Sequence, residues 1–346
     1  MNRPTVIGAL DAIPVEAVTL TAGGLTARLM TFGARLTELW VPGRDGTLAD
    51  IVLGFDTVEQ YRTSTAYIGA TCGRYGNRIR GGRFMLDDQP VQVDCNENGN
   101  HLHGGAAGLE RKVWTIAELA ESRVVFTIVS PAGEMGFPGT VRASAACDLS
   151  PEGLTVSMTA ETDAPTVLNL VHHSYFNLAG QGSGDVLRQM LRLDAPFYTP
   201  VDAGLLPTGA VLPVAGTPFD FTRAKPIGRD IGTVPGGYDH NFCLGGAGQG
   251  LRACATAWDP VSGRKMTLAA TEPGVQFYAG GSLPEGDPAK AGARLCRFAG
   301  FALETQKFPD SPNNAHFPSS RVDPGAPYRH QMQYRFTRCT EAGDDL

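Results

Sequence analysis

The chain has too few cysteines, too widely scattered, for a disulfide framework or a zinc site. Its seven cysteines are an odd number among 346 residues, and none forms a C-x-x-C pair. We therefore expect reduced, buried thiols without a chemical role. Long apolar runs are also missing, and the first residues already include Asp11 and Glu16. The sequence predicts neither a membrane span nor a signal peptide, so we expect a cytoplasmic protein.

Positive charge is also scarce. Lysine and arginine number 29 against 35 aspartate and glutamate residues, which gives a net charge of -6. Such a chain lacks the broad attraction to phosphate backbones that is typical of nucleic-acid-binding proteins. We therefore expect a small-molecule partner, neutral or anionic, and no nucleic acid or membrane. For the assembly we expect a monomer or a weak homodimer.

Helical periodicity is nearly absent, whereas strand periodicity recurs. Only the segment 56–61 carries a helix signal, a Thr-x-x-Gln capping pattern that begins at Thr57. Alternation of apolar and polar residues predicts two strands at 141–149 and 154–161, and the Ser-Pro-Glu-Gly segment 150–153 predicts a hairpin turn between them. Similar patterns predict further strands at 25–30, 36–41, 123–129, 265–270, 275–279 and 328–337.

Glycine and proline, at 43 and 24 residues, are abundant enough to supply many turns. Because strands do not alternate with helices, the pattern argues against a parallel doubly wound sheet and a TIM barrel and favours a large antiparallel sandwich or barrel. We predict an all-β fold, a large antiparallel β-sandwich. The length would suit two domains, but no linker or repeat divides the chain. We expect one domain over residues 1–346, with frayed tails at about 1–5 and 341–346.

Polar residues gather in five segments, 73–78, 100–105, 172–177, 237–241 and 303–306. Six of the seven histidines lie in or near them, counting His316 after the last. A pocket that uses proton transfer would produce this clustering, and so would a metal site. His101 and His103 would share one face if they were extended, but the glutamate that follows them in cupin metal sites is displaced to Glu110. We therefore expect no metal.

Two of these segments suggest a pocket for a sugar. His172 and His173 are neighbours on a predicted strand, so their side chains face opposite ways and at most one enters a shared pocket. Tyr175 follows at once as an aromatic platform. Glu304 ends a mostly apolar run, 298–303, where burial would raise the pKa of its carboxyl toward that of a working base.

Two other patterns leave alternatives open. Arg78 and its neighbours Arg74, Arg80 and Arg83 could form a phosphate or carboxylate cradle, bind hydroxyl groups, or lie on a solvated strand edge. The glycine-rich segment 245–250 precedes a predicted strand instead of a helix. It therefore indicates a loose hairpin turn and no nucleotide loop.

The five segments, taken in order, resemble the aldose 1-epimerase (galactose mutarotase) family. The likeness extends through 50–56, 133–139, 303–310 and 317–319, and so covers nearly the whole chain. It implies a large antiparallel β-sandwich with a sugar cleft on one sheet, in agreement with the strand pattern. It also implies an enzyme that needs no metal, nicotinamide or other cofactor and that acts on a free monosaccharide.

Carried over residue by residue, the resemblance implies that Glu304 is the general base, His173 the general acid and His103 a second histidine near the ring oxygen. It implies hydroxyl-binding roles for Arg78, Asn77, Asp239 and Gln276, beside the platform of Tyr175. The base takes the proton of the C1 hydroxyl while the acid protonates the ring oxygen, so the ring opens and can reclose on either face. We expect neighbouring carboxylates to keep the histidine protonated at neutral pH.

Three other functions remain as alternatives. A hexose-6-phosphate epimerase of the same fold would use the arginines between Arg74 and Arg83 for the phosphate. A glycoside hydrolase would use Asp239 and Glu304 as its carboxylate pair. A sugar-binding module would keep the pocket without turnover, although it would not need an acid–base set. His172 stands where relatives often have Asn, which leaves open which imidazole faces the sugar.

Overall fold

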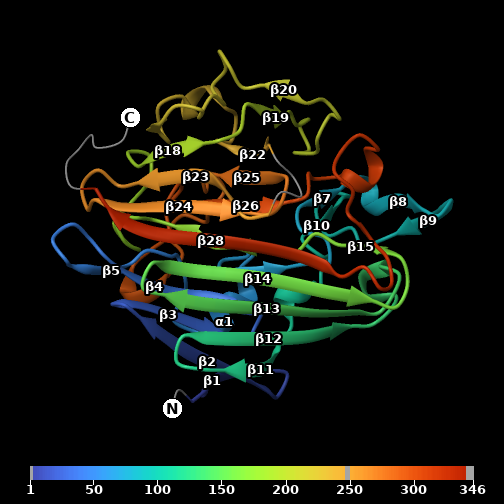
Figure 1. Cartoon of the computed structure of the whole chain (residues 1–346), viewed down its shortest axis with the longest axis horizontal. Coiled ribbons are helices and arrows are strands. Elements are labelled where there is room, and N and C mark those ends of the chain that lie inside the picture. Colours follow the sequence, from blue (N-terminus) through green and yellow to red (C-terminus); the bar gives the residue numbers. More distant parts are fainter. Residues whose placement is uncertain (1–2, 246–249, 340–346) are drawn as a thin grey trace.

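The structure is a computed structural model that describes residues 3–245 and 250–339, and strands dominate it (Figure 1). In these ranges the helices are α1 (Val58–Thr63) and six 3₁₀ turns: η1 (Arg80–Gly82), η2 (Leu109–Arg111), η3 (Glu134–Gly136), η4 (Ile231–Thr233), η5 (Lys290–Gly292) and η6 (Ser311–Asn313). None of these described helices has the length and apolar composition needed to span a membrane. The all-β prediction is confirmed.

One layer is a nine-stranded antiparallel sheet, in which β12, β13, β14 and β28 run side by side across Figure 1. Its strands, in order across the sheet, are β11 (Thr115–Leu119), β12 (Arg123–Ser130), β13 (Val141–Ser150), β14 (Gly153–Thr162), β28 (Tyr328–Arg338), β24 (Arg264–Ala270), β23 (Arg252–Trp258), β18 (Met190–Leu193) and β21 (Lys225–Pro226). Ser150 pairs with Gly153 where β13 turns into β14, which confirms the predicted hairpin.

Two further sheets face this layer. The first contains β1 (Thr5–Leu10), β2 (Ile13–Ala22), β3 (Leu25–Met30), β4 (Arg35–Pro42) and β5 (Leu48–Asp50). The second contains β17 (Tyr175–Phe176), β26 (Phe301–Gln306), β25 (Gly274–Tyr278), β22 (Asp239–Cys243), β19 (Phe197–Thr199) and β20 (Leu212–Pro213). All the strands predicted from alternation are present, with ends that shift by no more than a residue or two.

Four two-stranded ladders complete the described structure. They are β10 (His101–Leu102) with β7 (Arg78–Ile79), β16 (Val171–His173) with β6 (Ala70–Cys72), β8 (Arg83–Leu86) with β9 (Gln89–Gln92), and β15 (Thr166–Val167) with β27 (Arg321–Val322). Two of them, β10–β7 and β16–β6, carry residues of the predicted site, and β16 packs against β26 of the six-stranded sheet.

The core lies between the layers. Val156 on β14, Leu20 on β2 and Phe277 on β25 are fully buried members of one cluster of apolar side chains. Burying a side chain of this size contributes about 1.5 to 3 kcal/mol each, and alternation along the strands directs such residues to one face. The cluster extends along the chain from Val18 to Tyr334. One continuous cluster of this kind is what the predicted single domain requires.

The predicted helix signal is confirmed at Thr57. Its hydroxyl accepts a hydrogen bond from the backbone N–H of Gln60, and the Gln60 side chain accepts one from the backbone N–H of Thr57. This reciprocal capping box satisfies N–H groups that would otherwise lack partners at the start of α1. Val58 and Tyr61 bury the inner face of the helix.

Two predictions about irregular segments need correction or fall outside the described residues. Thr5 pairs with Ala17, so β1 already begins where a frayed tail was expected. Residues 1–2 and 341–346 lie outside the described residues, as do residues 246–249 of the expected glycine-rich hairpin. The flanking strands β22 and β23 belong to different sheets, so they do not form a hairpin.

Candidate active site

A cavity of about 240 Å³ lies beside the six-stranded sheet and collects the predicted site residues. Its walls include Glu304, His173, His103, Arg78, Asn77, Asp239 and Tyr175. These residues come from the strands β26, β16, β7, β22 and β17 and from the turns that follow β6 and β10. Gln276 is the exception, because its amide contacts Asp239 and is not part of the cavity wall.

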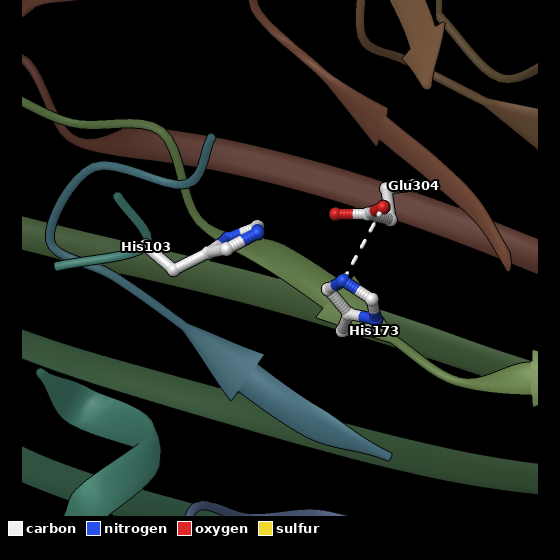
Figure 2. A group of neighbouring side chains, drawn as sticks. All are labelled: His103, His173 and Glu304. Carbon is white, nitrogen blue, oxygen red and sulfur yellow. Dashed lines mark ion pairs between the residues drawn. The ribbon is translucent and has the colours of Figure 1, made fainter. Parts of the chain in front are cut away.

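Glu304 and His173 form the centre of the cavity. Oε1 of Glu304 lies 3.4 Å from Nε2 of His173, and the two side chains are 2% and 5% exposed (Figure 2). His172 turns the other way, since its Nε2 lies 2.8 Å from the hydroxyl of Ser174 and its ring packs near Tyr334. Of the two adjacent histidines, His173 is therefore the one that faces the cavity.

His103 reaches the same cavity through a left-handed turn. Strand β10 ends at Leu102, and His103 has φ 49°, so the extended conformation in which His101 and His103 would share a face is not formed. Nδ1 of His101 lies 2.8 Å from the carbonyl of Asp94, and its Nε2 accepts a hydrogen bond from the N–H of Gly104. The ring of His103 lies 5.1 Å from that of His173.

The backbone determines which nitrogen of His103 carries a proton. The N–H of Asn77 donates to Nδ1 of His103 at 3.2 Å, so Nδ1 holds a lone pair and the neutral ring carries its proton on Nε2. His103 thus presents a hydrogen-bond donor. This bears on metal binding, because donor atoms of His103, His173 and Glu304 all lie within 4.8 Å of one another. A protonated nitrogen is no ligand, so this set fits a metal poorly.

Burial controls the protonation of the central pair. It raises the pKa of Glu304 well above its usual range, and the charge of Asp239 raises it further. Burial also lowers the pKa of His173 to about 3. The expectation that neighbouring carboxylates keep this histidine protonated is therefore wrong for the substrate-free protein. Burial therefore favours a protonated Glu304 beside a neutral His173.

Arg78 is held in place by a residue that the sequence did not reveal. Its Nε and Nη2 donate to the two carboxylate oxygens of Glu97 at 2.6 and 2.8 Å. Nη1 then lies 3.8 Å from Oδ2 of Asp239. The Arg78 N–H also donates to the side-chain oxygen of Asn77, which sits at φ 64°. The two hydrogen bonds to Glu97 give the guanidinium of Arg78 a fixed orientation. No spacing in the sequence indicates Glu97, because contact requires the turn between β9 and β10.

The neighbouring arginines Arg74, Arg80 and Arg83 make their contacts outside the cavity. Arg74 is buried and donates to Ser130 and to carbonyl groups near Gly139. Arg80 pairs with Asp202, and Arg83 donates to Gln92. The cradle of several arginines that the sequence left open is therefore not formed.

Aromatic rings complete the wall. The ring of Tyr175 lies 5.0 Å from that of His173 and 5.8 Å from that of Tyr278. The ring of Tyr67 is tilted against that of His103 at 4.6 Å and stacks on that of His173 at 5.9 Å. Tyr278 was missed because its segment, 275–279, indicates only a strand, and Tyr67 was missed because no motif marks the loop that carries it. Together these rings provide the apolar surface on which a sugar ring can pack.

Comparison with known proteins identifies relatives over almost the full length. The family model for aldose 1-epimerase matches residues 16–335. A galactose mutarotase of Bos taurus is 39% identical over 329 residues, which cover 95% of this chain and 96% of the relative. An aldose 1-epimerase of Escherichia coli is 34% identical over 335 residues, 94% of this chain and 96% of the relative.

A solved structure is similar in fold. The crystal structure of an aldose epimerase homologue from C. elegans superposes with a TM-score of 0.87 at 28% identity, covering 94% of this chain and all of that one. The matched family model, the curated relatives and the shared fold agree with one another. The chain belongs to the aldose 1-epimerase family.

Proposed function

We propose that this protein is an aldose 1-epimerase, a mutarotase that interconverts the α and β anomers of a free aldose such as galactose or glucose. The observation that carries this proposal is the contact between Glu304 and His173 in a buried cavity. A buried carboxyl and imidazole that share one proton can remove a proton from one oxygen and supply one to another. The names of the curated relatives support the same activity.

The reaction follows from the state of this pair. Moving its single proton from Glu304 to His173 produces a carboxylate and an imidazolium without any change in net charge. The carboxylate of Glu304 then accepts the proton of the C1 hydroxyl, and His173 gives its proton to the ring oxygen. The bond between C1 and the ring oxygen breaks as the C1 carbonyl forms. Rotation about the C1–C2 bond and reclosure, with the two roles reversed, yields the other anomer.

The remaining wall residues suit binding and orientation. In this proposal Nε2–H of His103 donates to an oxygen of the reacting end of the sugar. Arg78, Asn77 and Asp239 bind ring hydroxyl groups, and Tyr175 packs against the apolar face of the ring. No step needs a cofactor or metal.

The charges of the cavity favour a neutral sugar over a sugar phosphate. Among the described wall residues, Arg78 supplies a positive charge, but Glu97 already occupies two of its donors. Asp239 adds a second carboxylate near the same guanidinium. A phosphate dianion would meet these carboxylates at close range. The group that faces Glu304 at 3.4 Å is a histidine, which mutarotation uses and a two-carboxylate glycoside hydrolase does not.

A panel of fresh single-anomer sugars tests the proposal. We expect the protein to accelerate the decay of optical rotation of α-D-galactose or α-D-glucose, and hexose 6-phosphates to be neither substrates nor competitors. If every free aldose in the panel mutarotates at its spontaneous rate in the presence of the protein, the proposed enzymatic activity is refuted. Strong competition by a hexose 6-phosphate would refute the neutral-substrate assignment and favour the phosphate epimerase.

We also propose that the protein acts in the cytoplasm, as a monomer or weak homodimer and as one domain. The burial of Cys72, Cys147 and Cys254 supports the compartment, because burial raises the pKa of Cys147 and Cys254 to about 12 and makes these thiols unreactive. The expectation of buried thiols is wrong for Cys95, which is exposed. Light scattering of the purified chain would test the assembly.

A further inference from the structure

A chain of buried amides lies behind Asp239. Nε2 of Gln276 donates to Oδ1 of Asp239 at 2.6 Å. Nε2 of Gln306 in turn donates to Oε1 of Gln276 at 3.1 Å and to the side-chain oxygen of Asn241 at 3.2 Å. Gln306, Asn241 and Gln276 are 0%, 1% and 3% exposed. Gln306 ends the polar segment 303–306, but neither the sequence patterns nor the family resemblance assigns it a role.

The carboxylate determines the direction of this chain. An ionised Asp239 can only accept hydrogen bonds, so Gln276 must present its NH₂ group. The oxygen of Gln276 then points to Gln306 and needs a donor. If the Gln306 amide were reversed, its oxygen would face the oxygens of both Gln276 and Asn241. One arrangement therefore satisfies the contacts, and Gln306 supplies the donor that maintains it.

We propose that Gln306 is a positioning residue that fixes the amide of Gln276 and thereby aims the carboxylate of Asp239 into the cavity. With Oδ1 held by Gln276, Oδ2 lies on the side of Arg78. Without Gln306, the amide of Gln276 can turn over and present its oxygen to Asp239. This inference rests on the proposed function, because it assumes that Asp239 binds the sugar.

Two features distinguish this role from simple core packing. The oxygen Oε1 of Gln306 is buried and has no hydrogen-bond partner among the described residues. Leaving a buried acceptor unpaired costs free energy, so the gain from this side chain lies in its NH₂ group. In addition, the charge of Asp239 contributes to the raised pKa of Glu304, which couples the position of Asp239 to the proton exchange.

The variant Gln306→Met tests the proposal, because it keeps an unbranched side chain and removes both donors. We expect KM for galactose or glucose to rise about tenfold, while kcat changes much less, since a hydrogen-bonding group for bound sugar is misaligned. We also expect the basic limb of the kcat pH profile to move to lower pH, as the influence of Asp239 on Glu304 weakens.

Thr305→Val is the matched control. Thr305 is equally buried on the same strand, but its hydroxyl lies 2.7 Å from Nε2 of His330, on the face away from the cavity. It should lose stability while KM and the pH profile stay those of the wild type. An equal rise in KM in Thr305→Val would overturn the proposal, as would a wild-type KM and pH profile in folded Gln306→Met.

Gln306→Glu provides an independent test if the methionine variant does not fold. A protonated glutamic acid can still donate to Gln276, whereas a carboxylate cannot. We expect its KM to approach the wild-type value at about pH 5 and to rise toward about pH 8. A KM that follows the wild type at both pH values would overturn the proposal. Wild-type turnover is measured first in the same assay, and its absence would refute the proposed function instead.

Discussion

Nε2 of His173 and Oε1 of Glu304 lie 3.4 Å apart, and both side chains are almost completely buried. Burial favours the neutral form of each group, so it raises the pKa of the acid and lowers that of the base. Burial therefore favours the state in which Glu304 holds the proton and His173 is neutral. An exposed glutamate and histidine would reach the reactive carboxylate and imidazolium only between their ordinary pKa values of about 4.3 and 6.5.

The first prediction concerns the pH dependence of kcat/KM. The pair of Glu304 and His173 gains a second proton, on His173, only as the pH approaches the pKa of that histidine, about 3. It loses the proton of Glu304 only near the raised pKa of that carboxyl. We expect kcat/KM to change less than about twofold between about pH 5 and 6.5. Polarimetric rates, corrected for spontaneous mutarotation at each pH, measure this. A break near the ordinary histidine pKa would contradict the proposed protonation.

The second prediction concerns Glu97. Replacing it by glutamine removes the charge that holds Arg78, so the guanidinium loses its fixed orientation. We expect Glu97→Gln to raise KM about tenfold and to change kcat much less, as expected when a hydrogen bond to a charged group is lost. Arg83→Gln is the control, because Arg83 contacts Gln92 outside the cavity and should leave KM unchanged. A wild-type KM in Glu97→Gln would show that Arg78 needs no such support.

The third prediction concerns stability at low pH. Burial lowers the pKa of His172 to about 4, whereas the unfolded chain binds the proton near its ordinary value of about 6.5. As the pH falls through this window, the unfolded state gains protons first. This histidine alone should reduce the free energy of unfolding by about 3 kcal/mol.

Urea unfolding at several pH values tests this expectation. His172→Gln stays neutral throughout, so its stability should fall less steeply between about pH 6.5 and 4. Part of the slope should remain, because burial also lowers the pKa of His173 and His330. If the free energy of unfolding of His172→Gln falls with pH as steeply as that of the wild type, His172 does not cause the loss of stability.

Much of the fold could be predicted because burial of one sheet face leaves a period of two in the sequence. β13 and β14 alternate along most of their length, and the turn residues between them are themselves a strong signal. The short ladders β10–β7 and β16–β6 were not predicted, since two or three residues carry no periodicity. The six-stranded sheet was only partly predicted, because short strands that are buried on both faces, such as β22, do not alternate.

The sequence predicted most of the residues of the candidate site, but not how these residues are arranged. Glu304 and His173 could be paired only through the resemblance, as nothing local joins positions so far apart. The turn at His103 was missed because a positive φ in a residue other than glycine has weak sequence signals. Arg74 and Arg78 are equally plausible ligands in sequence, and only long-range packing separates them. Contacts made by Glu97 and Gln306 depend on the same packing.

The most direct test of the central claim is polarimetry of fresh α-D-galactose with wild-type protein and Glu304→Gln. The amide keeps the shape of the side chain but cannot accept and return a proton, so we expect the enzymatic acceleration to disappear while circular dichroism shows an intact fold. Glu110→Gln is the control, since burial also raises the pKa of Glu110, to about 7, yet its side chain lies outside the cavity wall and its loss should preserve turnover. Substantial acceleration by folded Glu304→Gln would contradict the account.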